Sequence, residues 1–403
     1  MGCTKSREKP HLFKPPKISN SYSPHFSKLL YCSNPGGNTN VIASLHAPEL
    51  GVCLINVWSL INDILVITNT WKAPASHTLT EHITDITFML IKEDYAERAT
   101  DVYRRLLLAS CSKSLIRENG EVASLNVIKV WDIETMREIN EIGAVNSREA
   151  LVGLKCKENK ICVLTTCGNI YIWSCMLNGG DCDSAFAMPI FNRISLFCCG
   201  EVQCDIFDFD IIKINHEKNR ACFKSPISSS LYEDFIIGIC WSDENDSVKS
   251  RMLFVKMNSQ KKIDINMENM TVTDFIIDNE FLYAVNLFKN GRVLVKMHIE
   301  RIEILQQFYI EPAIMGGLNF VELYNEKACD EKKKIPISYI KMIQINKQKL
   351  IAVLSTKGEI ELFNNDFCEI SSVDLHAEIE TADVDSTVFY IARKDGKVIC
   401  LSF

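Results

Sequence analysis

A short strand pattern that recurs along the chain most limits what these 403 residues can fold into. The clearest copies are "INVWSL", "IKVWDI" and "IYIWSC", and weaker copies are "MLFVKM", "VLVKMH", "IELFNN" and "VICLSF". In each copy apolar residues alternate with a period of two, which predicts a β-strand with one buried face. Aligned on one column, the copies place these residues at equivalent positions: Trp58, Trp131, Trp173, Val255, Lys296, Phe363 and Leu401.

The segments before these strands also repeat. A glycine stands just upstream in "CGNIYIW", "NGRVLVK", "KGEIELF" and "DGKVICL", and Asn-Gly or Asp-Gly is the strongest short-range hairpin signal. A further apolar segment precedes each turn, as in "KICVLTT" and "KLIAVLS". The pattern therefore predicts four-stranded antiparallel units with a period of about forty residues, which is typical of β-propeller blades.

The second unit resembles a repeat of the WD-repeat family of β-propellers. Its "LLLASCS" and "NVIKVWDIETMREINEIG" contain the small-residue strand and the Trp-Asp pair of that family, Trp131 and Asp132. Trp58 and Trp173 occupy the same column but are followed by serine, and the family's usual Gly-His pair is missing. The resemblance implies an all-β, seven-bladed propeller in which Trp58, Trp131, Asp132 and Trp173 are structural blade positions.

The expected blade boundaries follow from the repeats. We expect six blades over residues 26–71, 83–143, 150–200, 202–267, 271–310 and 337–375, and a seventh from "TADVDSTVFYIARKDGKVICLSF". The seventh lacks an outer strand, which an N-terminal segment such as "HLFKP" would supply and so close the ring. An eight-bladed ring is the alternative. The predicted organisation is a basic, Pro- and Ser-rich arm over 1–25 and a propeller over 26–403.

Three segments interrupt the repeat and are expected to be surface loops on the two faces of the propeller. They are 92–105, whose composition suits a short helix, 112–126, and 320–336 between the fifth and sixth blades. Because blades are scaffold and departures from them often hold function, we expect more than one contact surface for protein partners.

The sequence contains no recognisable catalytic, phosphate-binding or zinc-protease motif. His77 and His82 are five residues apart, so a strand would place them on opposite faces. The 17 cysteines form no Cys-x-x-Cys pair, and we interpret them as thiols that fill strand faces. We therefore expect a protein that is not an enzyme, with no cofactor, no metal and no small-molecule substrate. A net charge of −7 argues against direct nucleic-acid binding.

The N-terminus "MGCTKSREKP" matches the pattern for N-myristoylation at Gly2, and Cys3 is a candidate for palmitoylation. It resembles the acylated start of inhibitory-type G-protein α subunits and Src-like kinases. The first thirty residues are basic, with Lys5, Arg7, Lys9, Lys14, Lys17 and Lys28 against Glu8. A second lipid or a basic cluster makes myristoyl anchoring stable. The alternative is an ordinary basic tail that matches the pattern by chance.

These features predict a scaffold or adaptor subunit of a multiprotein complex. With Gly2 and Cys3 acylated, it would lie on a cytoplasmic membrane face and its partners would be other protein subunits and the membrane surface. The alternative is a soluble nuclear or cytosolic WD-repeat subunit that supports a catalytic partner. There is no secretory signal and no apolar run of about 20 residues that would span a membrane.

Overall fold

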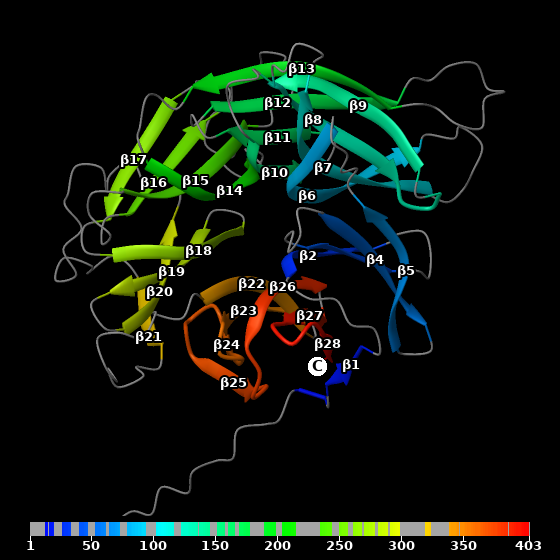
Figure 1. The fold of residues 1–403 in the computed structure, drawn as a ribbon. Coiled ribbons are helices and arrows are strands. Elements are labelled where there is room, and N and C mark those ends of the chain that lie inside the picture. The colour runs from blue at the N-terminus through cyan, green and yellow to red at the C-terminus, as the bar shows by residue number, and fades with distance from the viewer. Residues whose placement is uncertain are drawn as a thin grey trace, which may run out of the picture.

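The chain folds into antiparallel β-sheets arranged around a common centre (Figure 1). A computed structural model describes residues 13–14, 16–19, 26–33, 40–46, 53–61, 64–72, 79–93, 102–116, 122–135, 137–145, 151–157, 160–165, 169–177, 189–198, 204–214, 234–243, 250–256, 261–267, 270–278, 281–288, 291–298, 319–323, 338–345, 347–385 and 387–402. Within these ranges, the strands pair into seven four-stranded sheets.

Each sheet begins with an innermost strand near the centre and ends with an outermost strand at the rim. In that order, the first three sheets are β2 (Phe26–Cys32), β3 (Val41–His46), β4 (Leu54–Ile61) and β5 (Ile64–Lys72); β6 (Leu79–Glu93), β7 (Val102–Ile116), β8 (Val122–Asp132) and β9 (Arg137–Val145); and β10 (Leu151–Lys157), β11 (Lys160–Thr165), β12 (Asn169–Leu177) and β13 (Pro189–Cys198). The next three are β14 (Cys204–Ile214), β15 (Asp234–Asp243), β16 (Ser250–Lys256) and β17 (Lys261–Met267); β18 (Met270–Asp278), β19 (Phe281–Phe288), β20 (Gly291–His298) and β21 (Asn319–Leu323); and β22 (Ser338–Ile345), β23 (Gln348–Ser355), β24 (Glu359–Phe363) and β25 (Glu369–Asp374). The seventh sheet is β26 (Ile379–Asp385), β27 (Val388–Arg393), β28 (Val398–Ser402) and β1 (Lys17–Ile18).

The innermost strands contact one another in order. β2 contacts β6, β6 contacts β10, and the series continues through β14, β18, β22 and β26, which contacts β2. The sheets therefore follow one another as propeller blades do, and the first sheet lies beside the last (Figure 1).

The N-terminal strand at the edge of the seventh sheet lies a few residues later than expected. β1 pairs antiparallel with β28, Lys17 opposite Cys400 and Ile18 opposite Ile399. The amide of Lys14 donates to the carbonyl of Ser402 (2.8 Å) and that of Ser19 to Val398 (2.8 Å). In the expected segment "HLFKP", Phe13 instead packs on the core of the sixth and seventh sheets.

Parts of the three segments that were expected to be loops belong to strands instead. The fifth sheet ends with β21, inside the expected link 320–336 and beyond the expected end of that blade at residue 310. In the second sheet, β7 and β8 extend to Ile116 and from Val122, so most of 112–126 is a hairpin rather than a loop. The ends of 92–105 belong to β6 and β7, and the helix expected between them lies outside the described residues.

The repeated column found in the sequence has a single packing role on the third strand of its sheet. Trp58 packs with Tyr390 and Val398 of the seventh sheet. Trp131 packs with residues of the first sheet, and Trp173 with residues of the second. Phe363 and Leu401 likewise pack toward the fifth and sixth sheets. A large apolar side chain at this position therefore fills the space between its own sheet and the preceding one.

Carboxylates on three of the inner strands join their sheet to the following one. Asp85 on β6 accepts the amide of Leu154 on β10 (2.7 Å) and also pairs with the ammonium of Lys28 on β2. Asp85 thus links three consecutive sheets. Asp274 on β18 accepts the amide of Ile340 on β22 (2.8 Å).

Asp383 on β26 has the same role between the last sheet and the first. One oxygen accepts the amide of Tyr31 on β2 (2.7 Å), and the other lies 3.7 Å from the ammonium of Lys341 on β22. Tyr31 also stacks on Tyr390 with ring centroids 5.0 Å apart, and its hydroxyl donates to Asp385 (2.9 Å). Hydrogen bonds to charged groups contribute about 1.5–3 kcal/mol, so this junction does not depend on β1 alone.

Replacing Asp383 tests this junction. Asp383→Ala leaves the amide of Tyr31 without its acceptor, and we expect the free energy of unfolding to fall by about 1–3 kcal/mol. Asp383→Asn keeps an acceptor oxygen and loses only the charge near Lys341, so its loss should be under about 1 kcal/mol. Urea unfolding of the full chain measures both. An alanine variant that unfolds at the wild-type urea concentration would show that the bond is not stabilising.

Trp131 is 2% exposed between the first two sheets. Trp131→Ala should therefore destabilise the chain by about 3–5 kcal/mol, because the lost apolar contacts leave a cavity. Thermal or urea unfolding checks the value. Ile116→Ala is the control, since Ile116 is 49% exposed and should change stability by about 0.5 kcal/mol or less.

Candidate interaction surface

The residues that the sequence singled out on the blades lie in the interior. Trp58, Trp131 and Trp173 are buried at 0%, 2% and 5% exposure, each on the third strand of its sheet. Asp132 is also buried, at the end of β8. These positions contribute packing and hydrogen bonds rather than a binding surface. Gly2 and Cys3 lie outside the described residues.

Asp132 organises the turn that follows β8. One carboxylate oxygen accepts the amides of Glu134 and Thr135, both at 3.0 Å, and the other accepts the Arg104 side chain at 2.8 Å. The neighbouring Arg105 is 1% exposed and pairs with Glu134. The turn that contains the Trp-Asp pair is thereby fixed to β7.

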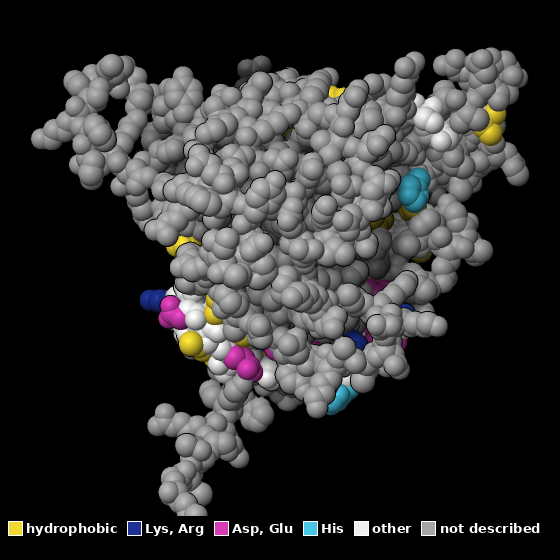
Figure 2. Space-filling view, turned by 90° about the vertical axis from the view of Figure 1, so that its left-hand side faces the viewer, with side chains coloured by type: hydrophobic (Ala, Val, Ile, Leu, Met, Phe, Trp, Pro, Cys, Tyr) yellow, Lys and Arg dark blue, Asp and Glu magenta, His cyan; other side chains and the backbone are white. Residues whose placement is uncertain are grey.

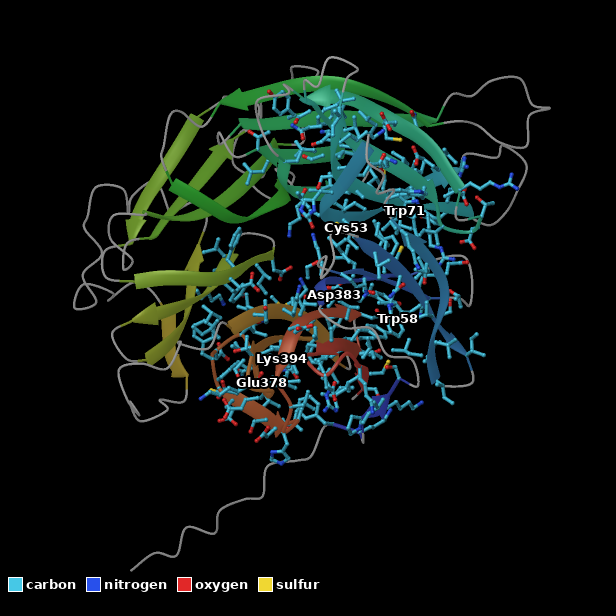
Figure 3. The ribbon with its side chains drawn as sticks, viewed as in Figure 1. Cys53, Trp58, Trp71, Glu378, Asp383 and Lys394 are labelled. Atoms are coloured by element: carbon cyan, nitrogen blue, oxygen red, sulfur yellow. The ribbon has the colours of Figure 1, made fainter. Side chains whose placement is uncertain are left out.

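A buried polar network surrounds Trp58 in the first sheet (Figure 3). The indole nitrogen donates to the hydroxyl of Ser44 (2.8 Å), and that hydroxyl lies 2.7 Å from Nε2 of His46. Asn56 lies 3.2 Å from the same His46 nitrogen and accepts from Thr70 (2.8 Å). Trp58 therefore has a polar partner in Ser44, although the Gly-His pair typical of WD repeats is missing.

A second buried polar cluster lies beside Trp131. The ammonium of Lys129 lies 2.8 Å from Glu81, 3.3 Å from Glu138 and 5.5 Å from the ring centroid of Trp71. Burial alone would lower the pKa of Lys129, but the two carboxylates outweigh it and the pKa is raised. Lys129 therefore stays charged. Trp71 meets Trp131 edge-on, with centroids 5.0 Å apart. The cluster joins β5 of the first sheet to the second.

The cysteines and histidines form no reactive or metal-binding cluster in the part of the chain that the structure describes. Burial raises the pKa of the Cys162 and Cys175 thiols to about 12, which keeps them protonated. Cys53 is 1% exposed, with its sulfur 3.4 Å from Nδ1 of His82. His77 is not among the described residues. Thiols of this kind fill strand faces, as in the sequence-based interpretation.

Exposed apolar side chains gather at the end of the β4–β5 hairpin in the first sheet. Five large apolar side chains are exposed among the described residues. Three of them, Leu60, Ile61 and Ile64, belong to the hairpin of β4 and β5, whereas Ile18 lies on β1 opposite Ile399, which packs toward the sixth sheet. Single exposed apolar residues are ordinary, whereas a cluster of them marks an interaction site. On the face that Figure 2 shows, the described side chains are a mixture of apolar, acidic and basic types.

Two lysines lie on the same side of the molecule as this cluster. The third strands of neighbouring sheets run in the same direction, so the end of β28 and the end of β4 share one face. The exposed Lys14 lies at the end of β28, bonded to Ser402, and the exposed Lys17 follows. Lys17 is opposite Cys400, whose side chain packs toward the first sheet. We call Leu60, Ile61 and Ile64 the seam surface.

None of the described residues forms a helix long and apolar enough to cross a membrane.

The comparisons with known proteins bear on the fold. No protein-family model matches the sequence, and neither does any curated protein.

Several solved structures are similar in fold at low sequence identity. BBS1N in complex with ARL6DN, in a crystal soaked with mercury, has a TM-score of 0.53 and 10% identity, covering 97% of this chain and 96% of that chain. The lead-soaked crystal of the same complex gives 0.51 and 11%, with the same coverage. U3-55K gives 0.52 and 9%, covering 96% of this chain and 98% of that chain. These are propeller-like folds, and the present chain is similar to them in fold along nearly its whole length.

Proposed function

We propose that the chain is a closed, seven-bladed, WD-repeat-like propeller that acts as a non-catalytic scaffold or adaptor subunit of a multiprotein complex. β1 completes the seventh blade, and the junction of Asp383 with Tyr31 holds the first blade to the last. One observation favours a scaffold above all. Interior polar groups such as Asp85 and Asp383 are bonded between strands and sheets, while apolar side chains remain exposed at the seam surface.

The similar structures support this role. BBS1N forms a complex with ARL6DN, so a propeller-like fold of this size serves there as a partner in a protein complex. A rigid ring presents loops and edges in fixed positions, and a few well-buried anchors then supply most of the affinity. The partners of this chain are accordingly other protein subunits, with no nucleic acid and no small-molecule substrate.

Acylation of Gly2 and Cys3 would place the propeller on a cytoplasmic membrane face. The arm joins the folded body at Phe13 and Lys14. The dozen residues before that point extend to roughly 40 Å at most, which would hold the seam surface close to the bilayer. The basic residues Lys5, Arg7 and Lys9 would add attraction to anionic lipids.

The alternative is a soluble nuclear or cytosolic subunit without lipid that supports a catalytic partner. It differs from the leading proposal only in the N-terminus. The state of Gly2 therefore separates the two.

Replacing Gly2 tests the membrane tether. In the cells that produce the protein, Gly2→Ala should move it from the membrane to the soluble fraction, because alanine at this position is not myristoylated. The mass of the N-terminal peptide should show myristate on the wild type, with or without palmitate on Cys3. Thr4→Ala is the matched control, since position 4 of the pattern is free to vary. An unmodified Gly2, or a distribution that Gly2→Ala does not change, would favour the soluble alternative.

The scaffold role makes a prediction about size. Extracted in mild detergent and separated by size, the protein should elute well above its own 45.8 kDa, with other subunits at fixed ratios. Elution as a monomer from fresh extract would contradict the scaffold role, whatever the state of Gly2.

A further inference from the structure

The hairpin of β7 and β8 extends farther than the equivalent hairpin of the first sheet. Nine residue pairs continue beyond the pair of Leu107 and Trp131 toward the turn, as far as Ile116 and Val122. In the described part of the first sheet, four pairs continue beyond Trp58. At about 3.3 Å per residue, the second hairpin reaches roughly 15 Å farther. The extra length falls in the segment 112–126, which the sequence analysis expected to be a loop.

The outer neighbour of this hairpin ends before the hairpin does. β9 pairs with β8 as far as Val145, which lies opposite Asn126, and an irregularity at Gly143 and Ala144 comes just before that end. Bulges of this kind often terminate pairing. None of the described strands pairs with the outer edge of Val122–Leu125. Within the described residues, β8 therefore has a four-residue edge that ends in no neighbouring strand.

The backbone at this edge directs hydrogen-bonding groups outward from alternate residues. The amide of Ile133 donates to the carbonyl of Arg105 (3.2 Å), and hydrogen-bonded pairs alternate along an antiparallel ladder. The register of β7 and β8 has no shift, so Leu125 bonds with β7 as Ile133 does. Val122 and Ser124 therefore direct their amides and carbonyls away from β7. Together they present two donors and two acceptors to a further strand.

The side chains near this edge also suit a further strand. Edge strands are usually blunted by charges, proline or bulges, and β9 has three charged residues as well as its irregularity. In contrast, residues 122–128 contain no charge and no proline. Leu125 is half-buried on the apolar cluster between the first two sheets, and Ser124 is exposed on the opposite face. An added strand would meet an apolar neighbour on one face and a small polar one on the other.

We propose that an extended segment of another protein subunit adds to the second sheet beside Val122–Leu125. Main-chain hydrogen bonds to Val122 and Ser124 supply its affinity, and its side chains supply specificity. The segment has apolar residues at every second position, on the face of Leu125, and polar residues between them. This deepens the proposed scaffold role and rests on it, because the segment belongs to a subunit of that complex.

A segment of another subunit suits this edge better than a second copy of the chain. A stable dimer interface buries about 800 Å² on each side. Two copies paired through four residues each would bury far less and share only four main-chain bonds. A subunit that is also held at other surfaces of the propeller needs only a short segment here, because the linked contacts act together.

Hydrogen exchange of individual backbone amides identifies the occupant. The samples are the isolated full chain and the complex extracted in mild detergent. In the isolated chain, the amides of Val122 and Ser124 should exchange rapidly, whereas that of Leu125 should be protected by β7. In the complex, exchange at Val122 and Ser124 should slow by about tenfold or more.

Two results in the isolated chain would overturn the proposal. Slow exchange at Val122 and Ser124 in dilute solution would mean that the chain covers its own edge. Protection that increases with the concentration of the isolated chain would mean that a second copy is the occupant.

Proline variants test whether the outward amides hold the segment. Ser124→Pro removes one outward donor and leaves the bonds to β7 in place, as proline does on an edge strand. It should weaken binding of one subunit by about tenfold, measured as loss of that subunit from the purified complex. Ser124→Ala is the matched control, because it keeps the amide and loses only the hydroxyl, and it should retain every subunit.

Val122→Pro removes the other outward donor and should release the same subunit, so the test does not depend on one variant. Unfolding curves that match the wild type establish that a variant is folded. A folded proline variant that keeps every subunit would overturn the proposal. So would loss of the same subunit from Ser124→Ala, because the hydroxyl rather than the backbone would then be the contact.

The outcome is separate from the test of the scaffold role. A complex that elutes at high mass but leaves Val122 and Ser124 unprotected keeps the scaffold role and binds its subunits elsewhere. Elution of the wild type as a monomer would instead contradict the scaffold role itself.

Discussion

The arrangement of the sheets depends on carboxylates that accept backbone amides across the gap between two sheets. Asp85, Asp274 and Asp383 lie on inner strands, and each accepts an amide of the inner strand that follows. The third-strand residues Trp58, Trp131 and Trp173 pack in the opposite direction, toward the preceding sheet. The second, fifth and seventh sheets are thus held to the following sheet by directed hydrogen bonds, while apolar burial holds sheets to the preceding one. Because hydrogen bonds have a fixed geometry, they define the position of one sheet relative to the next. Apolar packing alone allows a wider range of positions.

The sequence predicted the apolar packing between the sheets, but it did not predict the carboxylate–amide bonds between them. The third strand keeps a strict period of two, so its column could be aligned from residue 58 to residue 401. Asp85 and Asp274 follow an irregularity, because β6 and β18 each have an extra residue just before them, as β14 has before Asp208. In β26 the irregularity comes before Thr381, and Asp383 lies two residues beyond that position. Such a bulge shifts the alternation by one, so a period-two search passes over it. The related segments "ITDI", "IFDF" and "VTDF" are the signal that could have found these positions.

The position of the N-terminal strand and the seam surface could not be deduced from local pattern. Lys17 and Ile18 form too short a strand to show periodicity, and only the open edge of β28 selects them. In "SLINDILV", apolar residues stand in adjacent pairs on both sides of the turn. Neighbouring residues on a strand point to opposite faces, so pattern alone does not show which member of each pair is buried. The adjoining sheet decides it, covering Leu65 and leaving Ile64 in solvent.

One short segment lies between the basic N-terminal arm and the edge of the seventh sheet. β1 completes the seventh sheet, and the residues just before it lead to the basic arm and its acylation motif. A pull on the arm would fall first on the bonds of Lys14 to Ser402 and of Ser19 to Val398. The Asp383 and Tyr31 junction lies on other strands and does not bear that load directly. The first sheet and the seventh are therefore also joined by contacts that do not run through β1.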